Sequence, residues 1–224
     1  MPSLVKWLFL FALIAVNACH RDPLNPPPPE FPFPTSTWHI GLAAPNYMEA
    51  WIETVDVVDR RGLAYIRVHG GIPAMQSPAD NAGDPRGWPE EPGSGKTKSM
   101  TNIDLPEIIF VRWQSLVEPQ TYDVRIDLPQ WVRDEMVVPH EAHCWWEDTT
   151  RTEYRRTITI SMAPRGVAKV WLHAPCLEAM DIGRFVGEIH EEGPYDGTSG
   201  GKHRPLSPVA KEWVETHDIP YDSW

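Results

Sequence analysis

The sequence predicts a mainly β protein: an antiparallel β-sandwich with two short helices, preceded by a cleaved signal and a proline-rich spacer. Several segments alternate apolar and polar residues without a break, as half-buried strands do. The 224 residues include 11 tryptophans, and aromatic side chains favour pleated, half-buried surfaces. Only two segments show a helical pattern. Many strands with few helices are typical of two packed sheets, and a closed barrel filled by a ligand is the second architecture we consider.

Residues 1–18 have the order of features found in a secretory signal. Lys6 precedes an apolar run over 7–16, and the small residue Ala18 stands directly before Cys19. The run is too short to span a bilayer, which takes about 20 apolar residues. A small residue before a cysteine resembles the lipobox of bacterial lipoproteins, in which the cysteine becomes the acylated N-terminus. We therefore expect a lipid on Cys19; the alternative is an ordinary cleaved signal in which this cysteine is incidental.

The stretch 19–34 is expected to carry the lipid and a proline-rich linker. His20, rather than Asp, follows the cysteine, and in the lipoprotein sorting rule this implies release to the outer membrane, on its periplasmic face. The prolines between 21 and 34 exclude a helix or a strand ladder, so we expect an extended spacer that holds the folded part away from the membrane. The remaining residues, 35–224, are enough for one sizeable domain and too few for two domains of ordinary size. We therefore expect a single domain.

Seven segments carry strand patterns, and two turns join four of them into hairpins. Arg60-Arg61-Gly62 is a plausible turn for one hairpin, and Ala163-Pro164-Arg165-Gly166 is the turn of a second hairpin over 155–173. The expected strands are 38–42, 51–58, 63–68, 108–115, 122–128, 157–162 and 167–173.

The first expected helix begins at Pro129 and ends before Pro139. One face of this helix would carry Leu128, Trp131, Val132 and Met136.

The second expected helix lies near the end of the chain. Ser207 can cap it, Pro208 can occupy its first position, and 218–220 stop it. The stretch 73–106 is rich in Gly, Pro, Ser and Asp, and we expect it to form a long mobile surface loop.

The cysteines support an oxidising compartment. With Cys19 assigned to lipid, Cys144 and Cys176 remain. An even remainder in the periplasm predicts a disulfide bond between them, and two free buried thiols are the alternative.

The acidic composition narrows the class of partner. The formal net charge is −11 at pH 7. A nucleic-acid-binding protein normally carries a basic patch, so we do not expect nucleic acid as a partner. An acidic body also binds anionic headgroups poorly, so the lipid alone should provide the membrane link. The charge would steer the protein toward a basic protein partner.

One motif suggests a metal site. His140-Glu141-Ala142-His143 is one residue shorter than the zinc-protease helix motif, because two His ligands on one helical face need a spacing of four residues. We therefore expect a loop that enters a strand, and no metal. The alternative is a metal-dependent enzyme that uses His140, His143 and Cys144 together with His173 or His190.

Other motifs are weaker still. Gly93-Ser94-Gly95-Lys96-Thr97 resembles a phosphate-binding loop, but Glu90 stands where that loop needs glycine, so a flexible loop is expected. The acidic run that contains Glu188, His190, Glu191 and Glu192 is most simply a solvated loop. The segment 80–84 matches the pattern of a calcium-binding loop only weakly. No G-x-S-x-G elbow is present, and we expect neither catalytic residues nor a cofactor.

Three segments resemble a family of bacterial lipoproteins known as domain of unknown function 2931 (DUF2931). In that family a Pro-led strand carries Trp-x-Ser, a Tyr begins the next strand, and a Pro-x-Gly turn precedes a Val-Trp strand. These features match 105–116, 120–122 and 163–172, and the resemblance extends over about 36–190 and the leader. It implies a surface-anchored β domain and supplies no catalytic residues.

The leading hypothesis is therefore an outer-membrane lipoprotein whose acidic domain binds another protein without catalysis. Some lipoproteins of this kind sit beside contact-dependent toxin genes and look like immunity proteins, so immunity against a secreted toxin is one form of this hypothesis. A metal-dependent periplasmic enzyme and a structural envelope lipoprotein are the alternatives.

Overall fold

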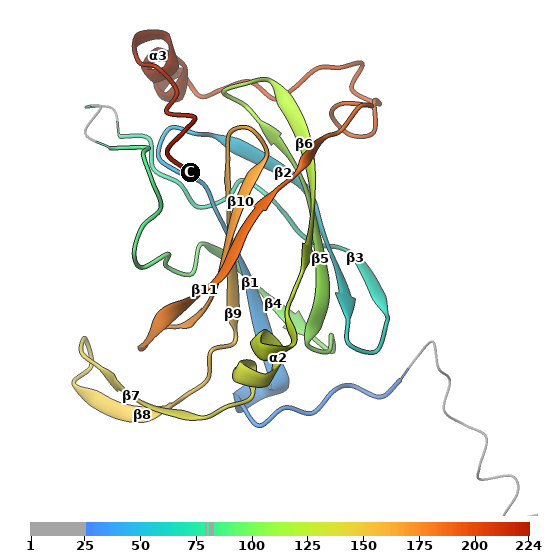
Figure 1. Ribbon diagram of the computed structural model, residues 1–224, viewed down its shortest axis with the longest axis vertical. Coiled ribbons are helices and arrows are strands. Elements are labelled where there is room, and N and C mark those ends of the chain that lie inside the picture. Colours follow the sequence, from blue (N-terminus) through green and yellow to red (C-terminus); the bar gives the residue numbers. More distant parts are fainter. Residues whose placement is uncertain (1–25, 79, 81–82) are drawn as a thin grey trace, which may run out of the picture.

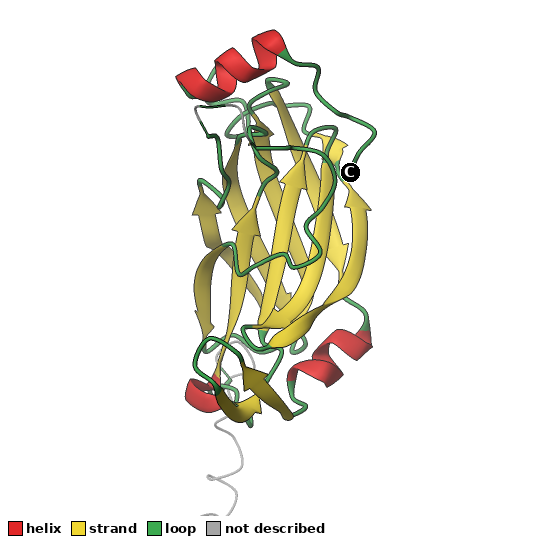
Figure 2. Cartoon of the chain, turned by 90° about the vertical axis from the view of Figure 1, so that its left-hand side faces the viewer, coloured by secondary structure: helices red, strands yellow, loops and turns green. Residues whose placement is uncertain are grey.

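The computed structural model describes residues 26–78, 80 and 83–224. The signal, Cys19 and its expected lipid lie outside these residues. Two five-stranded sheets pack face to face, with helices at opposite ends of the sandwich (Figures 1 and 2). The expected mainly β sandwich with two helices is confirmed. Within the described residues, no helix combines the length and apolarity that crossing a membrane requires.

Sheet A has the strand order β11-β10-β9-β1-β4. Its strands are β1 (Thr37–Ala43), β4 (Lys96–Thr101), β9 (Thr157–Ala163), β10 (Val167–Ala174) and β11 (Leu177–Val186). The pairing is antiparallel except between β1 and β9, which run parallel.

The parallel pair departs from the expected antiparallel arrangement for a visible reason. Parallel strands are normally covered on both faces, and every residue of β9 is buried. The segment before β4 supplies the outer cover: the Thr159 hydroxyl donates to the Gly93 carbonyl at 3.0 Å, and the rings of Trp88 and Trp171 meet edge to face at 5.8 Å.

Sheet B has the order β12-β6-β5-β2-β3 and is antiparallel throughout. Its strands are β2 (Ala50–Asp59), β3 (Ala64–Gly71), β5 (Pro106–Ser115), β6 (Gln120–Asp127) and β12 (Glu188–Ile189). The hairpins at Arg60-Arg61-Gly62 and over 155–173 form as predicted.

The main core lies between the two sheets. It includes the buried side chains Trp38, Ile40, Ile52, Trp113 and Ile160. The Trp38 indole donates to the Ile103 carbonyl at 3.0 Å, so its one polar atom is satisfied. Phe33, in the stretch expected to be a spacer, is buried in this core. The packed part of the chain thus includes residues before Thr35.

The two α-helices lie where the sequence places them. They are α2 (Gln130–Met136) and α3 (Pro208–Thr216), and a short 3-10 turn, η1 (Pro34–Ser36), precedes β1. The Ser207 hydroxyl accepts a hydrogen bond from the Ala210 amide at 3.2 Å, which confirms the expected cap. The prediction for one side chain of α2 was wrong: Trp131 is 37% exposed, because the short helix presents only Val132, Arg133 and Met136 to the interior.

The expected mobile loop over 73–106 is also wrong in part, because β4 lies within it and pairs with β1. The proposed flexible segment 93–97 runs into this strand. A Cβ atom on Gly95 would lie 2.7 Å from the Leu42 carbonyl oxygen, so the backbone is packed closely there. Only Met100 of β4 is buried, and an edge strand with so little apolar content gives no alternating pattern to recognise.

A third, two-stranded sheet was not expected. It consists of β7 (His140–Cys144) and β8 (Thr149–Glu153) and lies with α2 at one end of the sandwich, whereas α3 lies at the other (Figure 1). The histidine motif at 140–143 is therefore part of a strand itself and not a loop leading into one.

Candidate functional site

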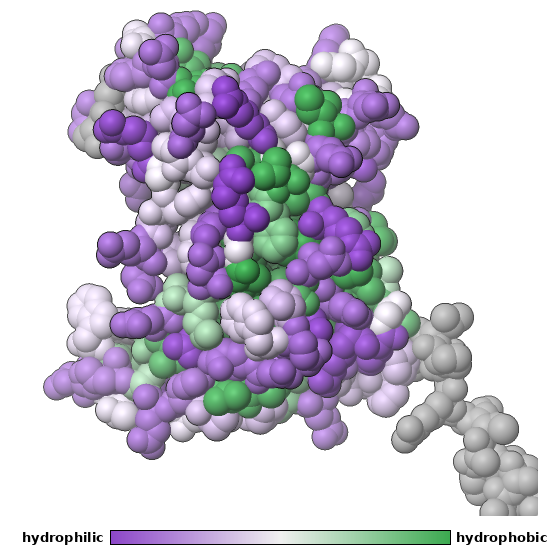
Figure 3. All heavy atoms as spheres, in the orientation of Figure 1, coloured by the Kyte–Doolittle hydropathy of each residue, from purple (hydrophilic) through white to green (hydrophobic). Residues whose placement is uncertain are grey.

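A groove of about 750 Å³ lies on the outer face of sheet B. Its floor comes from β5 and β6, and one wall is the chain from Val186 to Glu192. The face shown in Figure 3 is mainly hydrophilic, with apolar residues exposed along its middle.

Gly187 makes the wall possible. β11 pairs with β10 in sheet A as far as Val186, and β12 then pairs with β6 in sheet B. The Gly187 amide donates to the Gly166 carbonyl at 2.8 Å. A Cβ atom at Gly187 would lie 2.4 Å from the Asp123 carbonyl oxygen, so no larger residue fits without a backbone shift. This crossing places the acidic run 188–192 beside β6.

Four side chains form a closed network of polar contacts against this wall. Arg112 and Asp123 face each other across β5 and β6, and Arg112 Nε donates to Asp123 Oδ1 at 2.7 Å. The other Asp123 oxygen lies 2.6 Å from His190 Nδ1. His190 Nε2 is 3.3 Å from Asp196 Oδ1, and Arg112 Nη1 contacts Asp196 as well. Both carboxylates of the network thus contact Arg112 and His190.

The turn that carries Asp196 is fixed to the sheet by its backbone. Tyr195 and Asp196 both have positive φ angles, 55° and 52°, which are uncommon for residues with a side chain. The Tyr195 amide donates to both carboxylate oxygens of Glu53 at 3.0 Å. Glu53, on β2, also accepts a hydrogen bond from Gln114 at 2.8 Å. These bonds hold Asp196 over β5.

The interpretation of His190 as part of a solvated loop was wrong. Its side chain is only 13% exposed, and its amide donates to the Thr121 carbonyl at 2.9 Å. The one signal in the sequence that bears on this site is the pair of charged residues, Arg112 and Asp123, at outward positions of two well-predicted strands. That signal does not reveal which loop would cover them.

The histidines and cysteine of the alternative metal site do not converge. His140 Nε2 lies 2.7 Å from Glu135 Oε1, whereas His143 is in ion-pair range of Asp148 at 3.5 Å. Cys144 is bonded to Cys176. Successive residues of a strand point to opposite faces, so His143 points away from the face that carries His140 and Cys144.

The two distant histidines of that alternative lie in different sheets. His173 is on β10 of sheet A, and His190 follows β12 of sheet B. His173 is buried, and Thr159 Oγ1 lies 2.7 Å from its Nε2. Burial lowers the pKa of His173 to about 4, because the charged imidazolium would lose its hydration.

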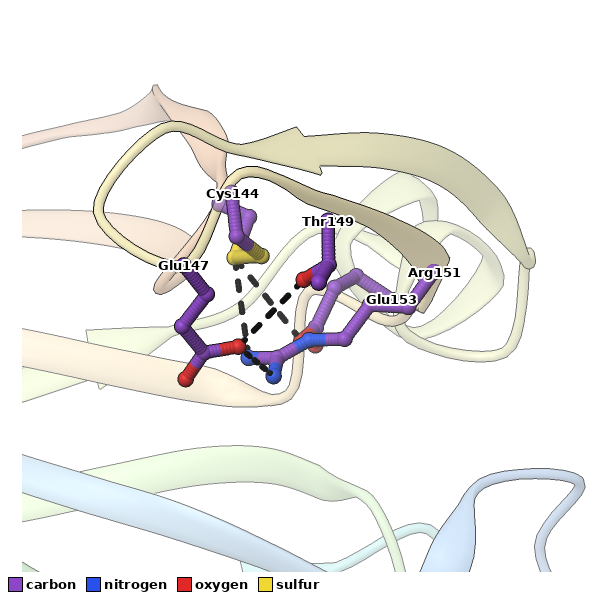
Figure 4. The surroundings of a disulfide bond; sticks show 6 residues. Cys144, Glu147, Thr149, Arg151 and Glu153 are labelled. Carbon is purple, nitrogen blue, oxygen red and sulfur yellow. Dashed lines mark hydrogen bonds and ion pairs between the residues drawn. A yellow bond between two sulfur atoms is a disulfide. The ribbon is translucent and has the colours of Figure 1, made fainter.

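The predicted disulfide between Cys144 and Cys176 is present in the structure. It joins the end of β7 to the turn between β10 and β11, with a Cα–Cα distance of 5.0 Å. Figure 4 shows Arg151 beside it, paired with Glu147 at 2.9 Å and Glu153 at 2.6 Å.

Two groups of side chains in the described part of the chain bring three metal-ligand atoms within 4.8 Å of one another. One is Cys144, Glu153 and Cys176, whose sulfurs are bonded to each other and so are not thiolate ligands. The other is His190, Glu192 and Asp196.

Comparison with known proteins identifies the family of the chain. The family described as "Protein of unknown function (DUF2931)" matches residues 21–222, which confirms the resemblance found in the strands and turns. No curated protein and no solved structure matches the chain.

Proposed function

The chain belongs to the DUF2931 family, and we propose that it is an outer-membrane lipoprotein that binds a basic protein partner in the groove of sheet B. Cys19 would carry the lipid and hold the domain on the periplasmic face of the membrane. The role is one of binding and not of catalysis. The His/Cys cluster on which the enzymatic alternative depends is not assembled among the described residues.

The charge of the groove is the observation that carries this proposal. Two arginines line it, Arg112 and Arg125, and Arg125 is already paired with Asp127 at 2.7 Å. The carboxylates that line it are Asp56, Asp123, Glu188, Glu191 and Glu192. An excess of carboxylates in a concave site concentrates negative potential and accelerates the encounter with a positively charged partner.

Two exposed aliphatic side chains on the same wall of the groove could contact a protein partner. Val186 and Ile189 are 59% and 58% exposed, and both line the groove. Protein interfaces combine an apolar centre with a polar rim. Val186 and Ile189 would supply apolar contact, and the glutamates around them would select a basic surface.

Site-specific photo-crosslinking in the native host tests the proposal. A photoreactive residue at Ile189 should give one discrete crosslinked partner protein. The same residue at Glu212, exposed on α3 and outside the lining of the groove, should not give that product. The double variant E188Q/E191Q should weaken the crosslink at Ile189, and E212Q/E215Q removes the same charge from α3 as a matched control. An identical product at both positions, or equal yield in both double variants, would refute groove binding.

The lipid anchor is tested separately. Cys19→Ser should abolish labelling with a fatty-acid probe and leave an uncut or soluble precursor. Equal labelling of the variant and the parent protein would overturn the assignment of Cys19, and would leave the groove experiment intact.

Immunity against a secreted toxin is the most specific form of the proposal. It requires that the crosslinked partner be an effector, and that cells lacking this protein become sensitive to neighbours that deliver it. A variant with E188Q/E191Q should then protect less well than one with E212Q/E215Q.

A further inference from the structure

We propose that His190, Glu192 and Asp196 form a binding site for a divalent transition-metal cation of the zinc type. Their ligand atoms all lie within 4.8 Å of one another. The inference is independent of the proposed protein partner, because the chain alone should bind the metal.

His190 Nε2 is the first observation that points to a ligand. This nitrogen is shielded from solvent and makes no hydrogen bond with the described residues. Asp196 Oδ1, at 3.3 Å, is close enough for an ion pair but not in hydrogen-bond geometry. A buried polar atom without a hydrogen bond is uncommon and calls for an explanation, and an unseen ion is one of the recognised ones.

Asp123 prepares the ring for this role. A carboxylate can only accept, so its 2.6 Å contact places the imidazole proton on Nδ1. In the neutral ring the lone pair is then on Nε2, and this is the form that binds a metal. A carboxylate behind a ligating histidine is the usual partner in metal sites, where it fixes the tautomer and the direction of the ring. Arg112, which holds Asp123 at 2.7 Å, secures that carboxylate in turn.

The donor set favours transition metals over calcium. One imidazole nitrogen and two carboxylate oxygens suit Zn²⁺, Mn²⁺ or Fe²⁺, whereas Ca²⁺ prefers six to eight oxygens. Bonds of about 2.0–2.2 Å place the ligand atoms of a tetrahedral zinc roughly 3.3 Å apart. The most distant ligand atoms must therefore approach each other by up to about 1.5 Å. Glu192 and Asp196 are exposed, which leaves room for this movement.

The guanidinium of Arg112 would compete with the metal cation for the carboxylate of Asp196. It contacts Asp196, whose Oδ1 is also the oxygen nearest to His190. The second oxygen of Asp196 is left for the metal, and the cation would share this carboxylate with the guanidinium. The coordination sphere would have open positions on the groove side, because only three protein ligands converge there.

Calorimetric titration of untagged full-length protein with Zn²⁺ tests the proposal, and Co²⁺ absorption provides a spectroscopic readout. We expect one equivalent of metal to bind and the Co²⁺ spectrum to show mixed nitrogen and oxygen ligands. Glu192→Gln should weaken binding by more than about tenfold, and Asp123→Asn by about 10–100-fold, through loss of the support behind His190. Glu191→Gln is the matched control: it removes the same charge one residue away and should change affinity by less than about twofold.

The outcomes separate a built site from general attraction by an acidic surface. Absence of binding below about 1 mM, a loss in E191Q equal to that in E192Q, or a Co²⁺ spectrum unchanged by His190→Gln would each overturn the proposal. Glu192 is exposed, so E192Q should fold even if His190→Gln does not, and the test stands on it alone.

Discussion

Two segments contain histidines, 140–144 and 188–196, and in each the fold differs from what the sequence suggests. The first concentrates potential metal ligands in five residues, and the fold disperses them between Glu135, Asp148 and a disulfide. The second resembles a solvated acidic loop, and the fold connects it with Arg112 and Asp123, both more than 60 residues away. Alternation along a strand separates neighbours, whereas pairing between strands unites residues that are remote in sequence.

The two segments are also held in place by different forces. The β7–β8 hairpin forms a sheet of its own outside the two main sheets, and a covalent bond ties it to the β10–β11 turn. The segment 188–196 is held by backbone hydrogen bonds to β6 and by ion pairs. We therefore expect the loss of the disulfide to destabilise the first segment strongly. The position of the second segment should instead be sensitive to changes in the backbone that carries it.

The largest expected effect is that of Cys144→Ser. The disulfide closes a loop across a sequence separation of 32 residues, and its removal should lower the free energy of unfolding by about 2–5 kcal/mol. Denaturant unfolding of the oxidised protein measures this difference. Cys176→Ser should give the same loss, and the double variant should add nothing further. Two thiols that react with an alkylating agent without reductant in the parent protein would contradict the bond.

His173 provides the next largest effect, through pH. Its folded pKa is about 4 because of burial, and the unfolded value is about 6.5. As the pH falls below 6.5, the unfolded chain binds the proton first, so stability should fall by up to about 3 kcal/mol between pH 6.5 and 4. Below pH 4 the folded protein is protonated too, and this contribution stops changing.

His173→Gln should reduce the slope of stability against pH over that window. Burial also lowers the pKa of His39 and of His69, so part of the slope should persist in the variant. His143→Gln is the control, because its side chain is 56% exposed. Parallel pH curves for the parent protein and His173→Gln would show that His173 is not protected from protonation.

The parts of the fold that the sequence reveals are those with local signals. The segments around β6 and β9 alternate apolar and polar residues, and their strands were predicted. The strands β4, β8, β11 and β12 were missed because Met100 is the one buried residue of β4 and the other three strands have none. The parallel pairing of β1 with β9 has no local signal, because the two strands are more than 100 residues apart in the sequence.

The candidate site follows the same rule. The charges of Arg112 and Asp123 are visible on predicted strands, and the turn chemistry of 163–166 was recognised. The site also needs the chain to cross from β11 in sheet A to β12 in sheet B. In addition it needs a turn with positive φ angles at Tyr195 and Asp196. Both depend on contacts with distant strands, such as that between Glu53 and Tyr195, and so neither can be read from neighbouring residues.

The smallest expected effect, and the sharpest test of how the second segment is held, is that of Gly187→Ala. The added Cβ would meet the Asp123 carbonyl, a backbone atom that cannot rotate away. The backbone shift should cost about 1–3 kcal/mol and should loosen β12 from β6. Amide hydrogen exchange at His190 measures this directly, because that amide donates to Thr121. Gly62→Ala, in the turn between β2 and β3, is the control: its φ of +78° strains an alanine, but no atom lies within 4 Å of the added Cβ. This control should cost about 1–2 kcal/mol without faster exchange at His190. Equal exchange in the two variants would mean that the strand crossing does not position the segment, and that its ion pairs alone do.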